Sequence, residues 1–188
     1  EMQMKKYSNV RVWQSLALMV SLSSVSVCFS AQKTIDVYRV NATAENKGIG
    51  EKIGTITFEE TKNGLLVHPH LKGLPAGDHG FHIHENPSCD SAEKDGKWVA
   101  AQAAGGHLDP HHTTHHEGPQ GKGHLGDLPK LVVDKKGETP HTVTAPRLTL
   151  ANIEGHSIII HEHGDNYADT PEALGGGVAR IACGVIVK

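Results

Sequence analysis

Histidines dominate the residues of this chain that could do chemistry. They account for 15 of its 188 residues, and neutral imidazole is the commonest side-chain ligand of transition metals in proteins. Many gather in two segments, GFHIHENPSC over residues 80–89 and HLDPHHTTHHEGPQGKGHLGD over residues 107–127. Metal binding is therefore the first hypothesis to test against the spacing of these residues.

The first segment places two imidazoles two residues apart. Side chains alternate along a strand, so His82 and His84 share one face while Phe81 and Ile83 share the other. Two imidazoles on one face suit zinc, copper or nickel. The same pattern also describes two solvated strand histidines, and this spacing alone does not decide between the two interpretations.

The second segment combines imidazole and carboxylate donors. His124 and Asp127 lie three residues apart, and the glycines around them allow a tight turn that brings both to one ion. Imidazole with carboxylate suits zinc, and His107 and His116 are further donors in the same stretch. The competing interpretation is a solvated histidine-rich loop that binds metal weakly.

Two single residues complete the set of candidates. His161 ends the apolar run 158–160, at a place where loops and sites gather. Arg180 follows three glycines at residues 175–177 and enters a further apolar stretch. A structural histidine and a surface arginine are the alternatives at these two positions.

The elements that must position these residues are predicted to be strands. Alternating, β-branched stretches lie at residues 33–40, 51–59, 65–71, 80–84, 131–134, 143–150, 157–161 and 179–187. Asn63–Gly64 predicts a hairpin turn, and Pro69 an edge or a bulge. Residues 85–130 show no periodic pattern of apolar residues, so a metal or a disulfide is needed to order them. Only residues 92–97 suggest a helical turn. The pattern predicts an all-β sandwich or barrel.

The N-terminal residues predict export. Lys5, Lys6 and Arg11 precede an apolar, serine-rich run at 16–29 and small residues at 30–31, which is the pattern of a secretory signal. We expect residues 1–31 to be removed, with Glu1 a translation artefact, and residues 32–188 to form one domain. The run is too short to span a bilayer stably, so no membrane association is expected after removal.

Export changes the balance of charges and cysteines. Residues 32–188 carry 15 basic and 20 acidic side chains, a net charge of −5, which argues against a nucleic-acid partner. An anionic substrate would then need a local positive field. Two cysteines remain, Cys89 and Cys183, and in an exported chain they most simply form one disulfide.

The motifs, taken in order, resemble those of the copper–zinc superoxide dismutases, and in particular of the bacterial periplasmic branch. The resemblance covers nearly all of residues 33–188. It implies a Greek-key β-sandwich or flattened barrel, immunoglobulin-like, of about eight strands with long metal-binding loops. The matching motifs are GFHIHENPSC (80–89), GGHLDP (105–110), HEGP (116–119), GHLGDLP (123–129), IIIHEHGDN (158–166) and GGGVARIACGVI (175–186).

The resemblance also implies a metal ligand set. Four imidazoles would bind copper and leave one side open, whereas three imidazoles and a carboxylate would close a structural zinc site. One histidine would bridge the two metals. The implied copper ligands are His82, His84, His107 and His161, and the implied zinc ligands are His107, His116, His124 and Asp127.

Further roles follow from the same resemblance. Asp165 is implied to link a copper ligand to a zinc ligand, and Arg180 to orient superoxide beside the copper. Cys89 and Cys183 match the disulfide of the family. His107 is implied to release copper and to carry a proton during the cycle.

The implied activity is dismutation of superoxide to O₂ and hydrogen peroxide by cycling Cu(II) and Cu(I), with zinc structural. The expected setting is a homodimer in the periplasm that protects the cell envelope from extracellular superoxide. The alternative is a periplasmic copper- or zinc-binding or copper-delivery protein on the same fold. Loss of a copper ligand or of Arg180 would favour that alternative, and the chain keeps them all.

Nine histidines are surplus to this ligand set, and most are expected at the surface. The three histidines within residues 111–115 could bind a second metal ion more weakly. The choice of His116 over His115 as the implied zinc ligand rests only on the Glu117–Gly118–Pro119 segment that follows. His68 and His70 flank Pro69 near where bacterial members build a two-fold interface, so an accessory metal or haem site is a further hypothesis. The surplus histidines are His68, His70, His79, His111, His112, His115, His141, His156 and His163, and the candidate steering lysines are Lys94, Lys97 and Lys122.

Overall fold

Antiparallel strands make up most of the computed structural model, which describes residues 30–188. The predicted signal segment lies almost wholly outside the described residues. Within them, no helix is long and apolar enough to cross a membrane. The strands are β1 (Gln32–Val40), β2 (Ile49–Thr61), β3 (Gly64–Leu71), β4 (Gly77–His79), β5 (Phe81–His84), β6 (Ala92–Lys94), β7 (Lys97–Val99), β8 (Leu131–Val133), β9 (Val143–Ala145), β10 (His156–His161) and β11 (Arg180–Ile186).

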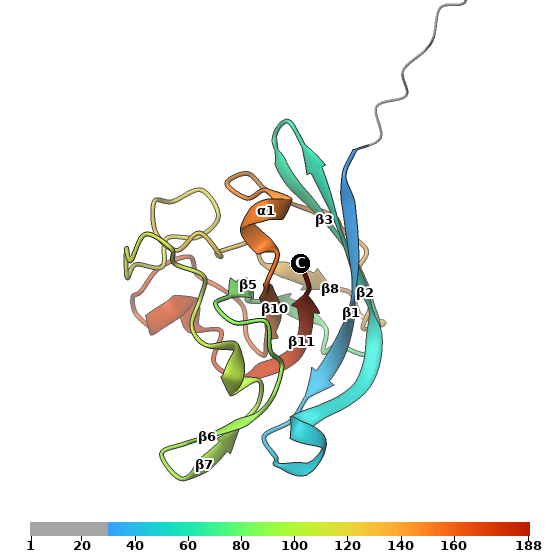
Figure 1. The fold of residues 1–188 in the computed structure, drawn as a ribbon, viewed down its shortest axis with the longest axis vertical. Coiled ribbons are helices and arrows are strands. Elements are labelled where there is room, and N and C mark those ends of the chain that lie inside the picture. Colours follow the sequence, from blue (N-terminus) through green and yellow to red (C-terminus); the bar gives the residue numbers. More distant parts are fainter. Residues whose placement is uncertain (1–29) are drawn as a thin grey trace, which may run out of the picture.

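Seven of these strands form one curled antiparallel sheet in the order β5-β10-β11-β1-β2-β3-β9, which wraps around the apolar core (Figure 1). β1, β2 and β3 are sequential neighbours, and β11 returns from the far end of the chain to pair with β1. That order is a Greek key, so the predicted all-β class is confirmed. The strands outnumber the eight or so expected because the connections form two small extra sheets, β4-β8 and β6-β7.

The β2–β3 hairpin forms where it was predicted. Its turn is Lys62–Asn63, and Gly64 opens the return strand with φ 107°, so the turn lies one residue earlier than expected. Pro69 is buried in β3, beyond the three residues that pair with β9. It therefore occupies a free edge, which is where a residue without a backbone N–H is tolerated.

The prediction of a helical turn at residues 92–97 is wrong. This stretch is the β6–β7 hairpin, with Asp95 and Gly96 at φ 53° and 74°. Such left-handed pairs favour Asp-Gly, a hairpin signal that was overlooked. The described residues hold one short α-helix, α1 (Leu150–Ile153), which Thr149 caps and which begins at the last residue of the strand expected at 143–150.

Three neighbouring strands carry His82, His84, His161 and Arg180. β5 pairs with β10, and β10 with β11, so that Ile159 lies opposite His82 and His161 opposite Arg180. All four residues of β5 are buried. Phe81 and Ile83 face the core cluster, while the outer edge of β5 pairs with loop residues through the isolated bridges His82–Asp127 and His84–His107.

Three short 3-10 turns lie in the connections. They are η1 (Glu45–Gly48), η2 (Gln102–Ala104) and η3 (Ala173–Gly176). The segment between η2 and β8 and the segment between β10 and β11 are long loops, and both pass over the histidine face of β5. The fold thus holds the candidate site between a rigid three-strand edge and two irregular loops.

Candidate metal centre

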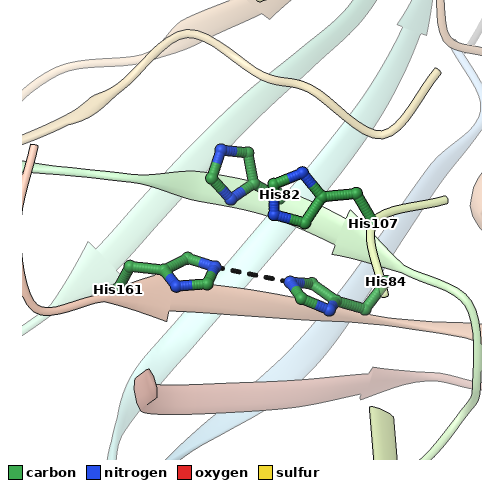
Figure 2. A group of neighbouring side chains, drawn as sticks. All are labelled: His82, His84, His107 and His161. Atoms are coloured by element: carbon green, nitrogen blue, oxygen red, sulfur yellow. Dashed lines mark hydrogen bonds between the residues drawn. The ribbon is translucent and has the colours of Figure 1, made fainter. Parts of the chain in front are cut away.

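Four histidines converge at this edge of the sheet. His82 and His84 come from β5, His161 from the end of β10, and His107 from the loop after η2 (Figure 2). One ring nitrogen of each lies within 4.8 Å of one ring nitrogen of every other, and all four side chains are buried. Buried imidazoles this close to one another are typical of a metal site rather than of solvated histidines.

Hydrogen bonds fix which nitrogen each ring offers to this cluster. His84 Nδ1 donates to the carbonyl oxygen of Gly105 at 3.0 Å, which leaves Nε2 facing His161 Nε2 at 3.4 Å. His82 Nε2 lies 2.6 Å from Asp165 Oδ2, which leaves His82 Nδ1 buried without a partner. A buried polar atom left unpaired costs about 1–3 kcal/mol, and a metal ion would supply the missing partner.

A second group of donors surrounds Asp127. Its Oδ1 lies 3.1 Å from His107 Nδ1 and 3.6 Å from His124 Nδ1, and its Oδ2 lies 2.9 Å from His116 Nδ1. A four-residue group at this place contains His82 in place of His124. His124 fits this group better, because its Nδ1 is buried, unpaired and 3.6 Å from Asp127, whereas the unpaired Nδ1 of His82 is already counted in the first group.

Asp165 joins the two groups. Its two carboxylate oxygens accept from His82 Nε2 at 2.6 Å and from His116 Nε2 at 2.8 Å. When Nδ1 binds a metal, both imidazoles are thereby held with their proton on Nε2, which is the usual task of a carboxylate behind a metal-binding histidine. The backbone N–H of Tyr167 donates to the same carboxylate at 2.7 Å and fixes its orientation.

The two groups differ in charge. Burial holds the pKa of His84 and of His161 well below the ordinary value, and burial together with the neighbouring His82 lowers the pKa of His107 to about 3. Burial also opposes protonation of His116, but hydrogen bonds to Asp127 and Asp165 outweigh it and raise the pKa of His116 to about 9. His84, His107 and His161 are therefore neutral at pH 7 in the metal-free protein, whereas His116 is a cation paired with carboxylates.

Arg180 borders an opening on the side of the first group. A cavity of about 170 Å³ is lined by His84, His107, His161 and Arg180, and by Leu174 at its rim. Of the second group, only the shared His107 lines it, and His116, His124 and Asp127 do not. The guanidinium donates from Nη1 to the carbonyl oxygen of Ala101 and from Nη2 to that of Gly105, both at 2.6 Å. A small anion in this cavity would meet a fixed positive charge beside three imidazoles.

Comparisons with known proteins decide the family. The family described as copper/zinc superoxide dismutase (SODC) matches residues 52–186. The Cu-Zn superoxide dismutase 2 of Salmonella typhimurium is 51% identical over 170 residues, 90% of this chain and 98% of that protein. The chain belongs to the copper/zinc superoxide dismutase family. It is thus an oxidoreductase of the kind predicted from the motifs.

Solved structures of this family share the fold. The Cu/Zn superoxide dismutase of Brucella abortus is 49% identical with a TM-score of 0.79, covering 83% of this chain and 99% of that one. The monomeric copper, zinc superoxide dismutase of Salmonella enterica is 54% identical with a TM-score of 0.74 over the same shares.

The disulfide of this superoxide dismutase joins Cys89 and Cys183, as predicted, with 5.7 Å between their Cα atoms. Both sulfurs lie in a buried cluster that also contains Ala101 and Ala104. Because Ala101 accepts a hydrogen bond from Arg180, the disulfide cluster supports the arginine as well as the loop.

Gly105 is the functional residue that the sequence did not single out. Its carbonyl oxygen accepts from both His84 and Arg180, and its φ of 77° brings it into this position. The glycines of GGHLDP were the available signal, because they mark a place where the backbone must adopt a left-handed conformation.

The choice between two adjacent histidines is visible in the structure. His116 is buried between Asp127 and Asp165, whereas the side chain of His115 is 69% exposed. His111 and His112 are exposed too. Within residues 30–188, the only groups of metal donors are the two already described, so these surplus histidines form no site of their own.

The hypothesis of a haem or accessory metal site at His68 and His70 is not supported. His68 Nδ1 lies 3.0 Å from Thr142 Oγ1 and Nε2 lies 3.1 Å from Glu59 Oε2, so neither nitrogen is free to bind a metal. His70 is exposed on the same face of β3. His79 is buried rather than exposed, and its Nδ1 lies 2.7 Å from the carbonyl oxygen of His161 and its Nε2 2.8 Å from that of Pro75.

The three candidate steering lysines are all exposed. Lys94 lines a groove of about 610 Å³ together with Arg180 and Trp98, which places a second cation beside the arginine. Lys97 lies on the neighbouring strand β7, and Lys122 lies in the loop over the second donor group. Of the three, Lys94 has the position best suited to attract an anion toward the cavity.

Proposed function

We propose that this superoxide dismutase holds copper in the first group of histidines and zinc around Asp127. The observation that best supports this assignment is the position of His107. Its Nδ1 faces Asp127, while its ring also belongs to the group formed by His84 and His161. A single imidazolate can serve two metals in this position. The proposed copper donors are His82 Nδ1, His84 Nε2, His107 Nε2 and His161 Nε2, and the proposed zinc donors are His107 Nδ1, His116 Nδ1, His124 Nδ1 and a carboxylate oxygen of Asp127.

The unpaired atoms support this assignment. Six buried side-chain atoms of the described residues have no hydrogen-bond partner, and four of them are proposed donor atoms: His82 Nδ1, His116 Nδ1, His124 Nδ1 and Asp127 Oδ2. Four imidazole nitrogens with an open side suit copper, and three nitrogens with one carboxylate oxygen suit a closed zinc site. When bound, copper would supply a one-electron couple and zinc a fixed positive charge.

The residues of the chain supply binding, orientation and protons. Arg180 offers the anion a charged fork at the wall of the cavity, where the surrounding protein has a net negative charge. The bonds to Ala101 and Gly105 hold that fork in place. His107 Nε2, which shares the cavity wall, is the atom proposed to hold the proton that leaves with hydrogen peroxide.

The cavity limits what can react. A volume of about 170 Å³ admits a small anion, and the exclusion of His116, His124 and Asp127 from its lining keeps the zinc side from contact with it. Two superoxide anions and two protons give one O₂ and one hydrogen peroxide, so the site needs one entry for the anion and a proton held beside it. Arg180 and His107 meet these two needs.

The setting of the enzyme is also a proposal. We infer that residues 1–31 direct export, that residues 32–188 fold as one domain in the periplasm, and that the enzyme protects the envelope from extracellular superoxide. The disulfide supports an oxidising compartment. A homodimer remains our expectation, while the Salmonella enterica relative is described as monomeric, and sedimentation equilibrium of the purified protein distinguishes the two.

Metal analysis with an activity assay tests the proposed function. We expect one copper and one zinc per chain and fast dismutation after reconstitution. A His161→Ala variant should lose copper while keeping zinc, and a His124→Ala variant should do the reverse. A protein that binds both metals but does not dismutate superoxide would favour the copper-delivery alternative and contradict the proposal.

A further inference from the structure

One arginine outside the metal centre holds the loop that carries two of its histidines. Arg147 lies between β9 and α1, and its neighbours Ala145 and Leu148 are buried in the core. Its Nε donates to the carbonyl oxygen of Pro119 at 3.1 Å, and its Nη1 to that of Gly123 at 3.1 Å. The arginine therefore reaches from a rigid part of the sheet into the loop of residues 116–124.

The second terminal nitrogen completes the contact. Arg147 Nη2 donates to the carbonyl oxygens of Gly118 at 3.3 Å and of His124 at 2.5 Å. All three guanidinium nitrogens are thus used, and the four acceptors lie on two stretches, 118–119 and 123–124. The first stretch begins two residues after His116, and the second contains His124 itself. The planar fork of arginine suits such a divided set of acceptors.

Other hydrogen bonds in this loop each hold a single backbone N–H, from His116 N to Asp169 Oδ2 at 3.0 Å and from Lys122 N to Glu117 Oε2 at 2.7 Å. Glu117, Gln120 and Lys122 are exposed, so the loop has no apolar side chains of its own to bury. Its own backbone provides the bond from His124 N to His115 O at 2.9 Å. Within residues 30–188, Arg147 forms no ion pair with a carboxylate, so its charge is met by these carbonyl oxygens. Arginine stays charged throughout the pH range in which proteins fold, so its donors are available to these carbonyl oxygens whether or not a metal is bound.

We propose that Arg147 is a positioning residue that preforms the zinc side of the centre. It fixes the backbone at both ends of the loop, so that His116 and His124 face Asp127 in the metal-free protein. A preformed site loses less conformational freedom when the ion binds, and its affinity is correspondingly higher. This inference rests on the proposed assignment of His116 and His124 to zinc.

Zinc affinity of single variants tests the role. The zinc dissociation constant of metal-stripped protein is measured by competition with a chelator for the unaltered chain, Arg147→Ala and Arg147→Lys. We expect both variants to bind zinc roughly 10- to 100-fold more weakly, the range seen when groups behind a ligand are lost. Lysine fails because its three donors share one nitrogen and cannot reach two separate stretches. Copper affinity should change little, since three of its proposed ligands are fixed by β5 and β10 and the fourth, His107, lies outside the loop of residues 116–124.

Arg39→Ala is the matched control. Arg39 also donates to a backbone carbonyl, that of Gly73, and pairs with Glu51 at 2.6 Å, but it touches neither metal loop. Zinc affinity of Arg147→Ala within twofold of the unaltered chain, or a loss equal to that of Arg39→Ala, overturns the proposal. If Arg147→Ala does not fold, the zinc affinity of Arg147→Lys tests the proposal with the same twofold limit and the same comparison with Arg39→Ala.

Two further measurements separate positioning from general stability. Hydrogen exchange of the amides at 116–124 in metal-free protein should be faster in Arg147→Lys, with the β10 amides unchanged, and equal exchange in the loop contradicts the role. The visible spectrum of Co²⁺ bound at the zinc site should weaken or shift in the same variant. If the unaltered chain binds no zinc, the zinc assignment itself is overturned, whereas normal zinc binding with unaffected Arg147 variants overturns this inference alone.

Discussion

Replacement of Asp165 by asparagine is the sharpest test of how the two halves of the centre are joined. The carboxylate accepts from His82 Nε2 at 2.6 Å through one oxygen and from His116 Nε2 at 2.8 Å through the other. Asparagine has the same shape but only one acceptor oxygen. In either orientation of the amide, one imidazole N–H faces an NH₂ group.

The imidazole that faces the NH₂ group must lose its hydrogen bond or move its proton to Nδ1, the nitrogen proposed to bind metal. Each contact is a hydrogen bond to a charged acceptor, worth about 1.5–3 kcal/mol. Because about 1.4 kcal/mol corresponds to a tenfold change in affinity, the loss is roughly 10- to 100-fold for at least one metal. Chelator competition for copper and for zinc measures it directly.

Asp169→Asn is the control for this experiment. The Asp169 carboxylate accepts from the backbone N–H of His116 at 3.0 Å but touches no ring of the proposed ligands by hydrogen bonding. Its affinities should stay within about threefold of the unaltered chain. Unchanged affinities for both metals in Asp165→Asn, or an equal loss in both variants, would refute the reasoning that Asp165 sets the imidazole tautomers.

Three further expectations follow from the geometry of the site. Arg180→Ala should lower dismutase activity severalfold or more while leaving the copper absorption spectrum nearly unchanged, with Arg180→Lys in between, and an unaltered rate would exclude a docking role. The pKa of His116 is about 9 in the folded metal-free protein and about 6.5 in the unfolded chain. Protonation of His116 therefore stabilises the folded protein below pH 6.5, and this contribution to the free energy of unfolding is lost as pH rises through 9. Urea titrations should show that decline, and calorimetry at pH 7 should show about one proton released per zinc bound, whereas proton-neutral uptake would contradict the shift. Removal of the disulfide in a Cys89→Ser, Cys183→Ser double variant should lower the free energy of unfolding by up to about 4–5 kcal/mol, given the 94-residue separation, and a loss under 1 kcal/mol would show that the link does not constrain the unfolded chain.

The sequence was most informative where function imposes residue types at fixed spacings. His82 and His84 could be placed on one strand face because strand side chains alternate, and their buried face on β5 follows that alternation. The strand pattern also predicted the fold class, since each apolar stretch had its own turn signal. What it could not supply was the partner of each strand, and hence the juxtaposition of His161 with Arg180 across β10 and β11.

The loops show why the remainder was out of reach. Local sequence offers His115 and His116 equally, and only the tertiary bond from His124 N to His115 O turns one side chain outward and the other inward. The strand expected at 143–150 ends at Ala145, because Pro146 follows and Thr149 caps a helical turn. Backbone carbonyls such as that of Gly105 carry no signature in a sequence, yet they orient the side chains that do.

The open and closed sides of the centre depend on different kinds of support. On the copper side, the carbonyl oxygen of Gly105 accepts from both His84 and Arg180, so the proposed ligand and the proposed anion-binding group share one fixed point. A displacement of that carbonyl would therefore disturb metal and substrate together. On the zinc side the support comes from charged groups behind the loop, the carboxylate of Asp165 and the guanidinium of Arg147. Because neither lines the cavity, the loop can be held firmly without narrowing the path by which superoxide enters.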